Sequence, residues 1–235
     1  MSSDSSESIG KESKEPENSL QEDLAAYKLR ARVYKKIINR YADAIGRGEQ
    51  KTVPQLKELI KPGDLAVLEV RDQLINKVEG DKKTSVQGKP FETKLLKYDF
   101  EKDFLAVAPK AFEYVKSLQS INAEIDASYW LSPAEIVELQ AADPMDKAIF
   151  LCSLLHALGC KDARVRLVQL EDASKHPLVI FQYDNQTYLL DALCESWDFH
   201  ASKGELDALL QGFSCQGKKY AHSLYEFSNE EYSEL

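Results

Sequence analysis

The spacing of apolar residues changes character at Gly159, and this change constrains the fold more than any other feature of the chain. Before Gly159 the large apolar residues recur every three or four positions, which is typical of amphipathic helices. After it, segments rich in β-branched and aromatic residues are bounded by turn residues, which predicts strands at 163–170, 177–183 and 187–193, a helix near 203–211 and a last strand at 219–228. The DNQ sequence between the second and third strands predicts a tight hairpin. Helices followed by an antiparallel sheet predict an α+β fold.

Composition divides the chain into four predicted regions. Residues 1–19 are mostly Ser, Glu and Lys, and their few large apolar residues predict a disordered acidic tail. Residues 20–50 read as one amphipathic basic helix. Residues 51–122 read as a helical region, and residues 123–235 as the α+β core, a buried helix packed on the sheet. Within the helical region we expect helices at 65–79 and 97–121.

The helix predicted over 20–50 carries an apolar stripe at three-four spacing. Its members are Leu24, Tyr27, Ala31, Tyr34, Ile38, Tyr41 and Ile45, and lysines and arginines crowd the other face. Such a stripe packs either on the protein's own helices or on a partner protein or peptide, and both interpretations stay open. A weak homo-oligomer through residues 24–45 is a variant of the second. The predicted interaction residues are Tyr27, Tyr34, Ile38, Tyr41 and Ile45.

Composition also limits the kinds of partner and the compartment. A net charge of -9 makes nucleic acid an unlikely partner, with the basic helix face as the one feature that argues otherwise. No apolar run is long enough to cross a membrane, and residues 1–20 lack the apolar core of a secretion signal, so we expect no secretion. The four cysteines have no CxxC spacing, which predicts reduced thiols in a cytoplasmic protein. We expect no cofactor and no metal, because paired-ligand spacing is missing.

The segment "AADPMDKAIFLCSLLHALGC" at 141–160 predicts the buried helix of the core. Asp143 is placed to cap its first turn, and Pro144 takes the first helical position, where proline costs no backbone hydrogen bond. Cys152, two turns along, lies among large apolar residues and is predicted to pack in the core. His156 on the same helix is predicted to be structural or exposed.

Several short motifs in a fixed order carry a family resemblance. They are Trp130 with Pro133, the "DPMDKA" at 143–148, the "LLHALG" at 154–159, His176, and the "YLLDA" at 188–192. This ordered set resembles the transglutaminase-like domain of the papain-type superfamily, and the preceding helices look like those of its archaeal members. The resemblance implies a cysteine at the start of the core helix, a histidine on a strand and an aspartate after the next strand.

The resemblance places the vestigial triad at Pro144, His176 and Asp191. It implies that Trp130, Asp143, Asp146 and Cys194 line the cleft. Proline cannot attack a carbonyl, so the sequence predicts a catalytically inactive scaffold that binds a protein or peptide. The alternative is a cysteine-type hydrolase or acyltransferase with another nucleophile, for which Cys194 and Asp146 are the candidates.

Overall fold

The computed structural model describes residues 15–47, 53–84, 98–121, 130–194, 196–199 and 203–235. Its helices and strands, in chain order, are α1 (Glu15–Gly46), η1 (Val53–Leu59), α2 (Leu65–Thr84), α3 (Phe100–Ser117), β1 (Gln119–Ser120), α4 (Pro133–Leu139), β2 (Ala141–Ala142), α5 (Pro144–Ala157), β3 (Arg164–Leu170), β4 (Lys175–Tyr183), β5 (Gln186–Leu190), β6 (Lys203–Gly204), α6 (Leu206–Gly212), β7 (Ser214–Cys215), β8 (Lys218–Phe227) and β9 (Tyr232–Glu234). The predicted α+β class is confirmed.

The antiparallel sheet has the strand order β6-β5-β4-β3-β8-β7, and β9 pairs with β8. Two residues with positive φ, Asp184 and Asn185, form the turn between β4 and β5, where the DNQ sequence predicted a hairpin. The hairpin sets β5 antiparallel to β4, so the end of β5 returns to the start of β4. A separate parallel pair, β1 with β2, was not predicted.

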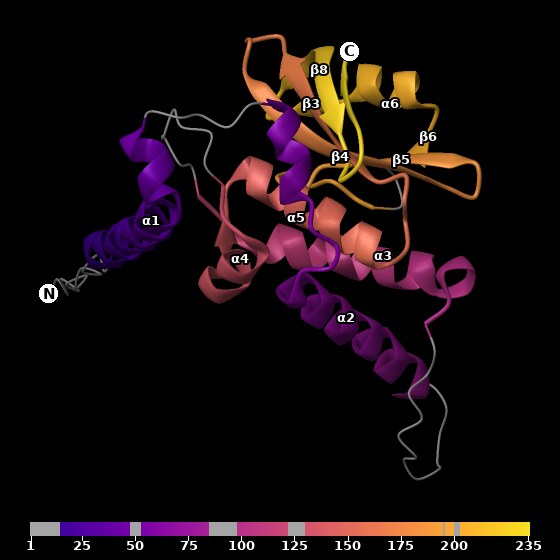
Figure 1. Ribbon diagram of the computed structural model, residues 1–235, viewed down its shortest axis with the longest axis horizontal. Helices are drawn as coiled ribbons and strands as arrows, with labels where there is room; N and C mark the ends of the chain where they lie inside the picture. Colours follow the sequence, from indigo (N-terminus) through magenta and orange to yellow (C-terminus); the bar gives the residue numbers. More distant parts are fainter. Residues whose placement is uncertain (1–14, 48–52, 85–97, 122–129, 195, 200–202) are drawn as a thin grey trace, which may run out of the picture.

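Helices cover the two faces of the sheet unequally. Figure 1 shows α2, α3 and α5 on one side of the sheet and the short α6 on the other. On β4, Val179 and Phe181 belong to the large core with α5, whereas Leu178 and Ile180 belong to a smaller cluster with α6. The alternation follows from the period of two along a strand.

The helix α5 is buried almost all round. Its apolar residues from Ala148 to Leu155 are at most 5% exposed, and Cys152 is 0% exposed, as predicted. The same core cluster includes residues of η1, α2, α3 and α4, so the helical region and the sheet share one core.

The N-terminal boundary differs from the prediction. The helix α1 begins at Glu15, inside the tail predicted over 1–19, and ends at Gly46, within the region predicted to be helical over 20–50. The first residues of that tail, 1–14, lie outside the described part of the chain. Tyr41 has non-helical φ and ψ and marks a kink in α1.

Candidate functional site

His176 and Asp191 form a buried pair at one end of the β4–β5 hairpin. His176 is the second residue of β4, and Asp191 directly follows β5. Nε2 of His176 lies 3.0 Å from Oδ2 of Asp191, and the two side chains are 9% and 0% exposed. The hairpin therefore brings together the two residues that the motif order paired.

The other carboxylate oxygen of Asp191 is held by the backbone that follows it. Oδ1 accepts hydrogen bonds from the amides of Leu193 at 2.9 Å and Cys194 at 3.3 Å. Farther along, Trp197 donates its indole N–H to the carbonyl of Leu189 at 2.9 Å, which ties the turn back to β5. These contacts fix the direction in which Oδ2 points toward the imidazole.

Pro144 begins α5, and the polar residues beside it contact backbone. Asp143 is the N-cap and accepts from the amide of Asp146 at 2.7 Å. Asp146 accepts from the amide of Leu131 at 3.0 Å. Burial raises the pKa of both carboxyls, and for Asp146 the charge of Asp143 adds to a large upward shift. Both aspartates predicted to line a cleft therefore have structural roles at the start of this helix.

Trp130, the third predicted cleft residue, packs against the large core while partly exposed. Its carbonyl accepts from the hydroxyl of Tyr41 at 3.1 Å. This hydrogen bond connects α1 with the segment that precedes α4. The backbone of Trp130 therefore helps to hold the N-terminal helix in place.

Lys147, in the first turn of α5, was missed by sequence reasoning. It is 2% exposed, and its Nζ donates to the carbonyl of Lys116 at 3.3 Å. Burial lowers the pKa of Lys147, and the negative charge of Asp191 opposes that shift. This electrostatic interaction connects the first turn of α5 with the His176–Asp191 pair. The residue follows Asp146 in the "DPMDKA" motif, but a lysine in a helical first turn normally suggests exposure.

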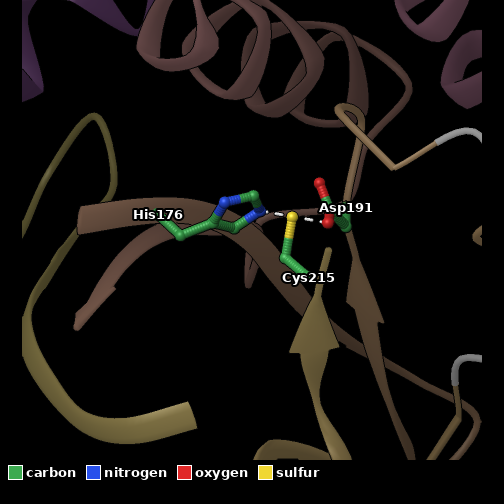
Figure 2. Close-up of side chains that lie close together, drawn as sticks. All are labelled: His176, Asp191 and Cys215. Atoms are coloured by element: carbon green, nitrogen blue, oxygen red, sulfur yellow. Dashed lines mark hydrogen bonds and ion pairs between the residues drawn. The ribbon is translucent and has the colours of Figure 1, made fainter. Parts of the chain in front are cut away.

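Cys215, also missed, lies beside the buried pair. A ring nitrogen of His176, a carboxylate oxygen of Asp191 and Sγ of Cys215 all lie within 4.8 Å of one another. Figure 2 shows the thiol next to the edge of the imidazole that faces Asp191. Burial raises the pKa of Cys215, and the charge of Asp191 raises it further. The sequence alone could not identify this cysteine. Its strand, β7, is only two residues long, and the position of β7 depends on its pairing with β8.

The remaining cysteines and His156 of α5 have environments that are ordinary for structural residues. Cys194, a predicted cleft residue, is partly buried and lies with its Sγ 3.2 Å from the hydroxyl of Ser196. Burial raises the pKa of Cys152 well above its usual value and that of Cys160 to about 12. His156 contacts the carbonyl of Ala163 at 2.8 Å through Nε2, which fits the predicted structural role.

The predicted interaction helix docks on its own protein, but through a face beside the predicted stripe. Among the α1 side chains that the structure describes, the buried apolar ones are Val33 and Ile37, at 3% and 6% exposed. The stripe members Tyr34 and Tyr41 are partly buried, whereas Ile38 is 56% exposed. Tyr27 is 72% and Leu24 52% exposed, and the side chain of Ile45 lies outside the described part.

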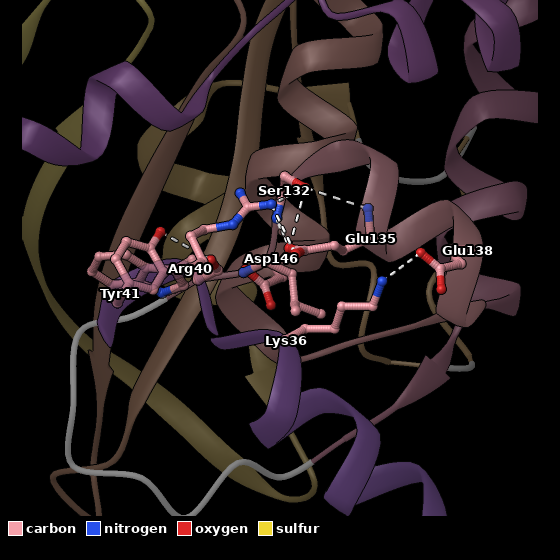
Figure 3. Close-up of polar contacts among 9 residues, drawn as sticks. Lys36, Arg40, Tyr41, Ser132, Glu135, Glu138 and Asp146 are labelled. Carbon is pink, nitrogen blue, oxygen red and sulfur yellow. Dashed lines mark hydrogen bonds and ion pairs between the residues drawn. The ribbon is translucent and has the colours of Figure 1, made fainter. Parts of the chain in front are cut away.

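Basic residues of α1 reinforce this docking (Figure 3). Lys36 forms an ion pair with Glu138 at 2.7 Å, and Arg40 forms one with Glu135 at 2.8 Å. Arg40 also donates to the hydroxyl of Ser132 at 2.7 Å. Ser132 and Glu135 are the capping box of α4, so α1 contacts the residues that start that helix.

Comparison with known proteins gives a partial structural likeness. No protein-family model matches the sequence, and no curated protein matches it. Solved structures of Legionella pneumophila LapG resemble the fold. The EGTA-treated form is 18% identical with a TM-score of 0.42, covering 79% of this chain and 87% of that chain. The calcium-bound form is 19% identical with a TM-score of 0.43, covering 67% and 87% respectively. Within the described part of the chain, none of the helices is both long and apolar enough to cross a membrane.

Proposed function

We propose that this protein is a non-catalytic transglutaminase-like protein, of the archaeal type, that binds a protein or peptide partner. The observation that carries the proposal is Pro144 at the first position of α5. In the family that the sequence resembles, that position holds the nucleophilic cysteine. Proline has no group that can attack a carbonyl, and here it is combined with the N-cap Asp143 in a stable helix start.

The rest of the triad supports the family interpretation. His176 and Asp191 are paired at 3.0 Å, with the imidazole oriented by a buried carboxylate, as a papain-type triad requires. Without a thiol at the start of α5, this pair has no nucleophile in the position that the resemblance implies. The four free cysteines are consistent with a reducing compartment, and we propose a cytoplasmic location.

The proposed partner surface is the exposed apolar side of α1. Its residues are Leu20, Leu24, Tyr27 and Ile38, each more than half exposed. Leu24, Tyr27 and Ile38 lie on the predicted stripe, whereas the docked face uses Val33 and Ile37. An exposed apolar stripe on a helix is the element that a groove in another protein recognises.

Substitutions at the neighbouring residues Ile37 and Ile38 distinguish a loss of partner binding from a loss of stability. Ile38→Asp should leave the melting temperature unchanged and abolish association, measured by solution mass and by affinity capture with the full-length protein. The matched variant Ile37→Asp places a charge at a buried position and should lower the melting temperature by several degrees. Unchanged association of Ile38→Asp would refute the partner surface.

Catalytic inactivity is tested separately. The wild-type protein should show no transamidase or peptidase turnover above background. Pro144→Cys should create a thiol at a helix N-terminus, where the helix dipole lowers its pKa, so that iodoacetamide labels it at pH 6. An ordinary thiol pKa in this variant would mean that α5 and His176 no longer share a site.

The alternative function is a cysteine-type hydrolase or acyltransferase with Cys215 as the nucleophile. The closeness of its thiol to His176 and Asp191 favours this alternative. Its raised pKa argues against it, because only the thiolate is nucleophilic. Wild-type turnover that disappears in Cys215→Ser and persists in Cys194→Ser would replace the non-catalytic proposal.

A further inference from the structure

Three side chains with different ligand atoms meet beside α6. His176 comes from β4, Asp191 follows β5, and Cys215 ends β7. Their nitrogen, oxygen and sulfur atoms lie within 4.8 Å of one another, and Figure 2 shows them directed into one small space. We propose that these three side chains bind a single Zn²⁺ ion.

The separations suit a tetrahedral ion. Zinc bonds of about 2.0–2.3 Å place neighbouring ligand atoms about 3.4–3.6 Å apart. Nε2 of His176 and Oδ2 of Asp191 are 3.0 Å apart, and the separations to the thiol are no more than 4.8 Å.

The ligand types select zinc over the hard cations. Imidazole and thiolate are ligands of Zn²⁺, whereas Ca²⁺ and Mg²⁺ take mainly oxygen. The carboxylate is also held in place, because Oδ1 of Asp191 accepts from the amides of Leu193 and Cys194. Such outer hydrogen bonds orient a ligand and leave Oδ2 directed at the ion.

A bound cation would offset the negative charge of the Asp191 carboxylate, whose side chain is fully buried. Zinc binding would release the thiol proton to solvent and form the sulfur–zinc bond. It also needs the lone pair of Nε2, so a neutral His176 would carry its proton on Nδ1.

A cobalt titration tests the site directly. Chelator-treated full-length protein should bind one equivalent of Co²⁺ and develop a thiolate-to-cobalt charge-transfer band, which Zn²⁺ then removes. Cys215→Ser should lose the band, and His176→Gln should weaken binding by more than about tenfold. The matched control is Cys194→Ser, which removes a neighbouring thiol outside the three ligands and should keep the band.

A second measurement needs no variant and covers the case in which Cys215→Ser fails to fold. Zinc should protect Cys215 of the wild-type protein from iodoacetamide, read by mass spectrometry of its peptide, without changing the labelling of Cys194. No saturable binding at one equivalent, a charge-transfer band that survives in folded Cys215→Ser, or unprotected Cys215 would overturn the proposal. These readouts do not depend on turnover or on partner binding.

Discussion

The start of α5 and the end of the β4–β5 hairpin differ in how their polar atoms are satisfied. At the start of α5, the carboxylates of Asp143 and Asp146 accept from backbone amides. At the end of the β4–β5 hairpin, the side chains of His176 and Asp191 contact each other. The first end therefore serves helix formation. The second holds a buried pair of titratable side chains.

The largest loss of stability is expected when the side-chain contacts at the end of the β4–β5 hairpin are removed. Asp191→Ala removes the acceptor of His176 and of the amides of Leu193 and Cys194. Buried donors left without an acceptor cost about 1–3 kcal/mol each, with partial relief by solvent, so we expect about 3 kcal/mol of lost unfolding free energy. Urea denaturation measures the loss. A change below about 1 kcal/mol would mean that this end contributes no more than a surface pair.

The second prediction concerns how stability depends on pH through Asp146 at the start of α5. The pKa of Asp146 is raised in the folded state, so the native protein binds a proton more tightly than the unfolded chain. Its contribution to stability is therefore most favourable at low pH and falls as the pH rises from about 3.9 through the folded pKa. Asp146→Asn should remove this part of the pH dependence and flatten the fall in the urea midpoint above about pH 4.

Asp172→Asn is the matched control for the pH measurement. Lys218 and Ser174 lower the pKa of Asp172 to about 2 through side-chain hydrogen bonds. A lowered pKa gives stability that is present above about pH 3.9 and lost as the pH falls through the folded value. The two variants should therefore change the slope in opposite directions. Equal changes would contradict the different environments of the two carboxyls.

The smallest effect is expected at Pro144. Its fixed φ suits the first helical position and restricts the unfolded chain, so Pro144→Ala should cost about 0.4–1 kcal/mol of unfolding free energy. The measurement is again the urea midpoint, with His176→Gln used to compare the two ends. A larger loss of unfolding free energy in Pro144→Ala than in His176→Gln would contradict the expectation that the hairpin end contributes more to stability.

The sequence predicted the elements whose own residues determine them. The apolar segment after Pro144 gave a buried helix, and the DNQ turn placed Asp191 opposite the start of β4, next to His176. Local spacing and turn chemistry were sufficient there. The parallel pair β1–β2 could not be predicted, because two-residue strands 22 positions apart in register carry no local pattern.

The face by which α1 docks also escaped sequence reasoning. Apolar spacing singled out the stripe with Ile38, but the buried face is centred on Val33 and Ile37. That face lies where Lys36 and Arg40 can reach the acidic residues of α4. Periodicity reports which side of a helix is apolar, whereas the position of its partner charges depends on the tertiary fold. Cys215 was missed for a similar reason, since only the sheet brings it to His176.

Arg40 also connects α1 with α5 mechanically. It contacts Ser132 at the start of α4, the preceding amide of Leu131 donates to Asp146, and Asp146 lies in the first turn of α5. A pull on the N-terminal end of α1 would load the apolar contacts of Val33 and Ile37 first, and then, through Arg40, this chain of polar contacts. The start of α4 would therefore pass the force on to α5.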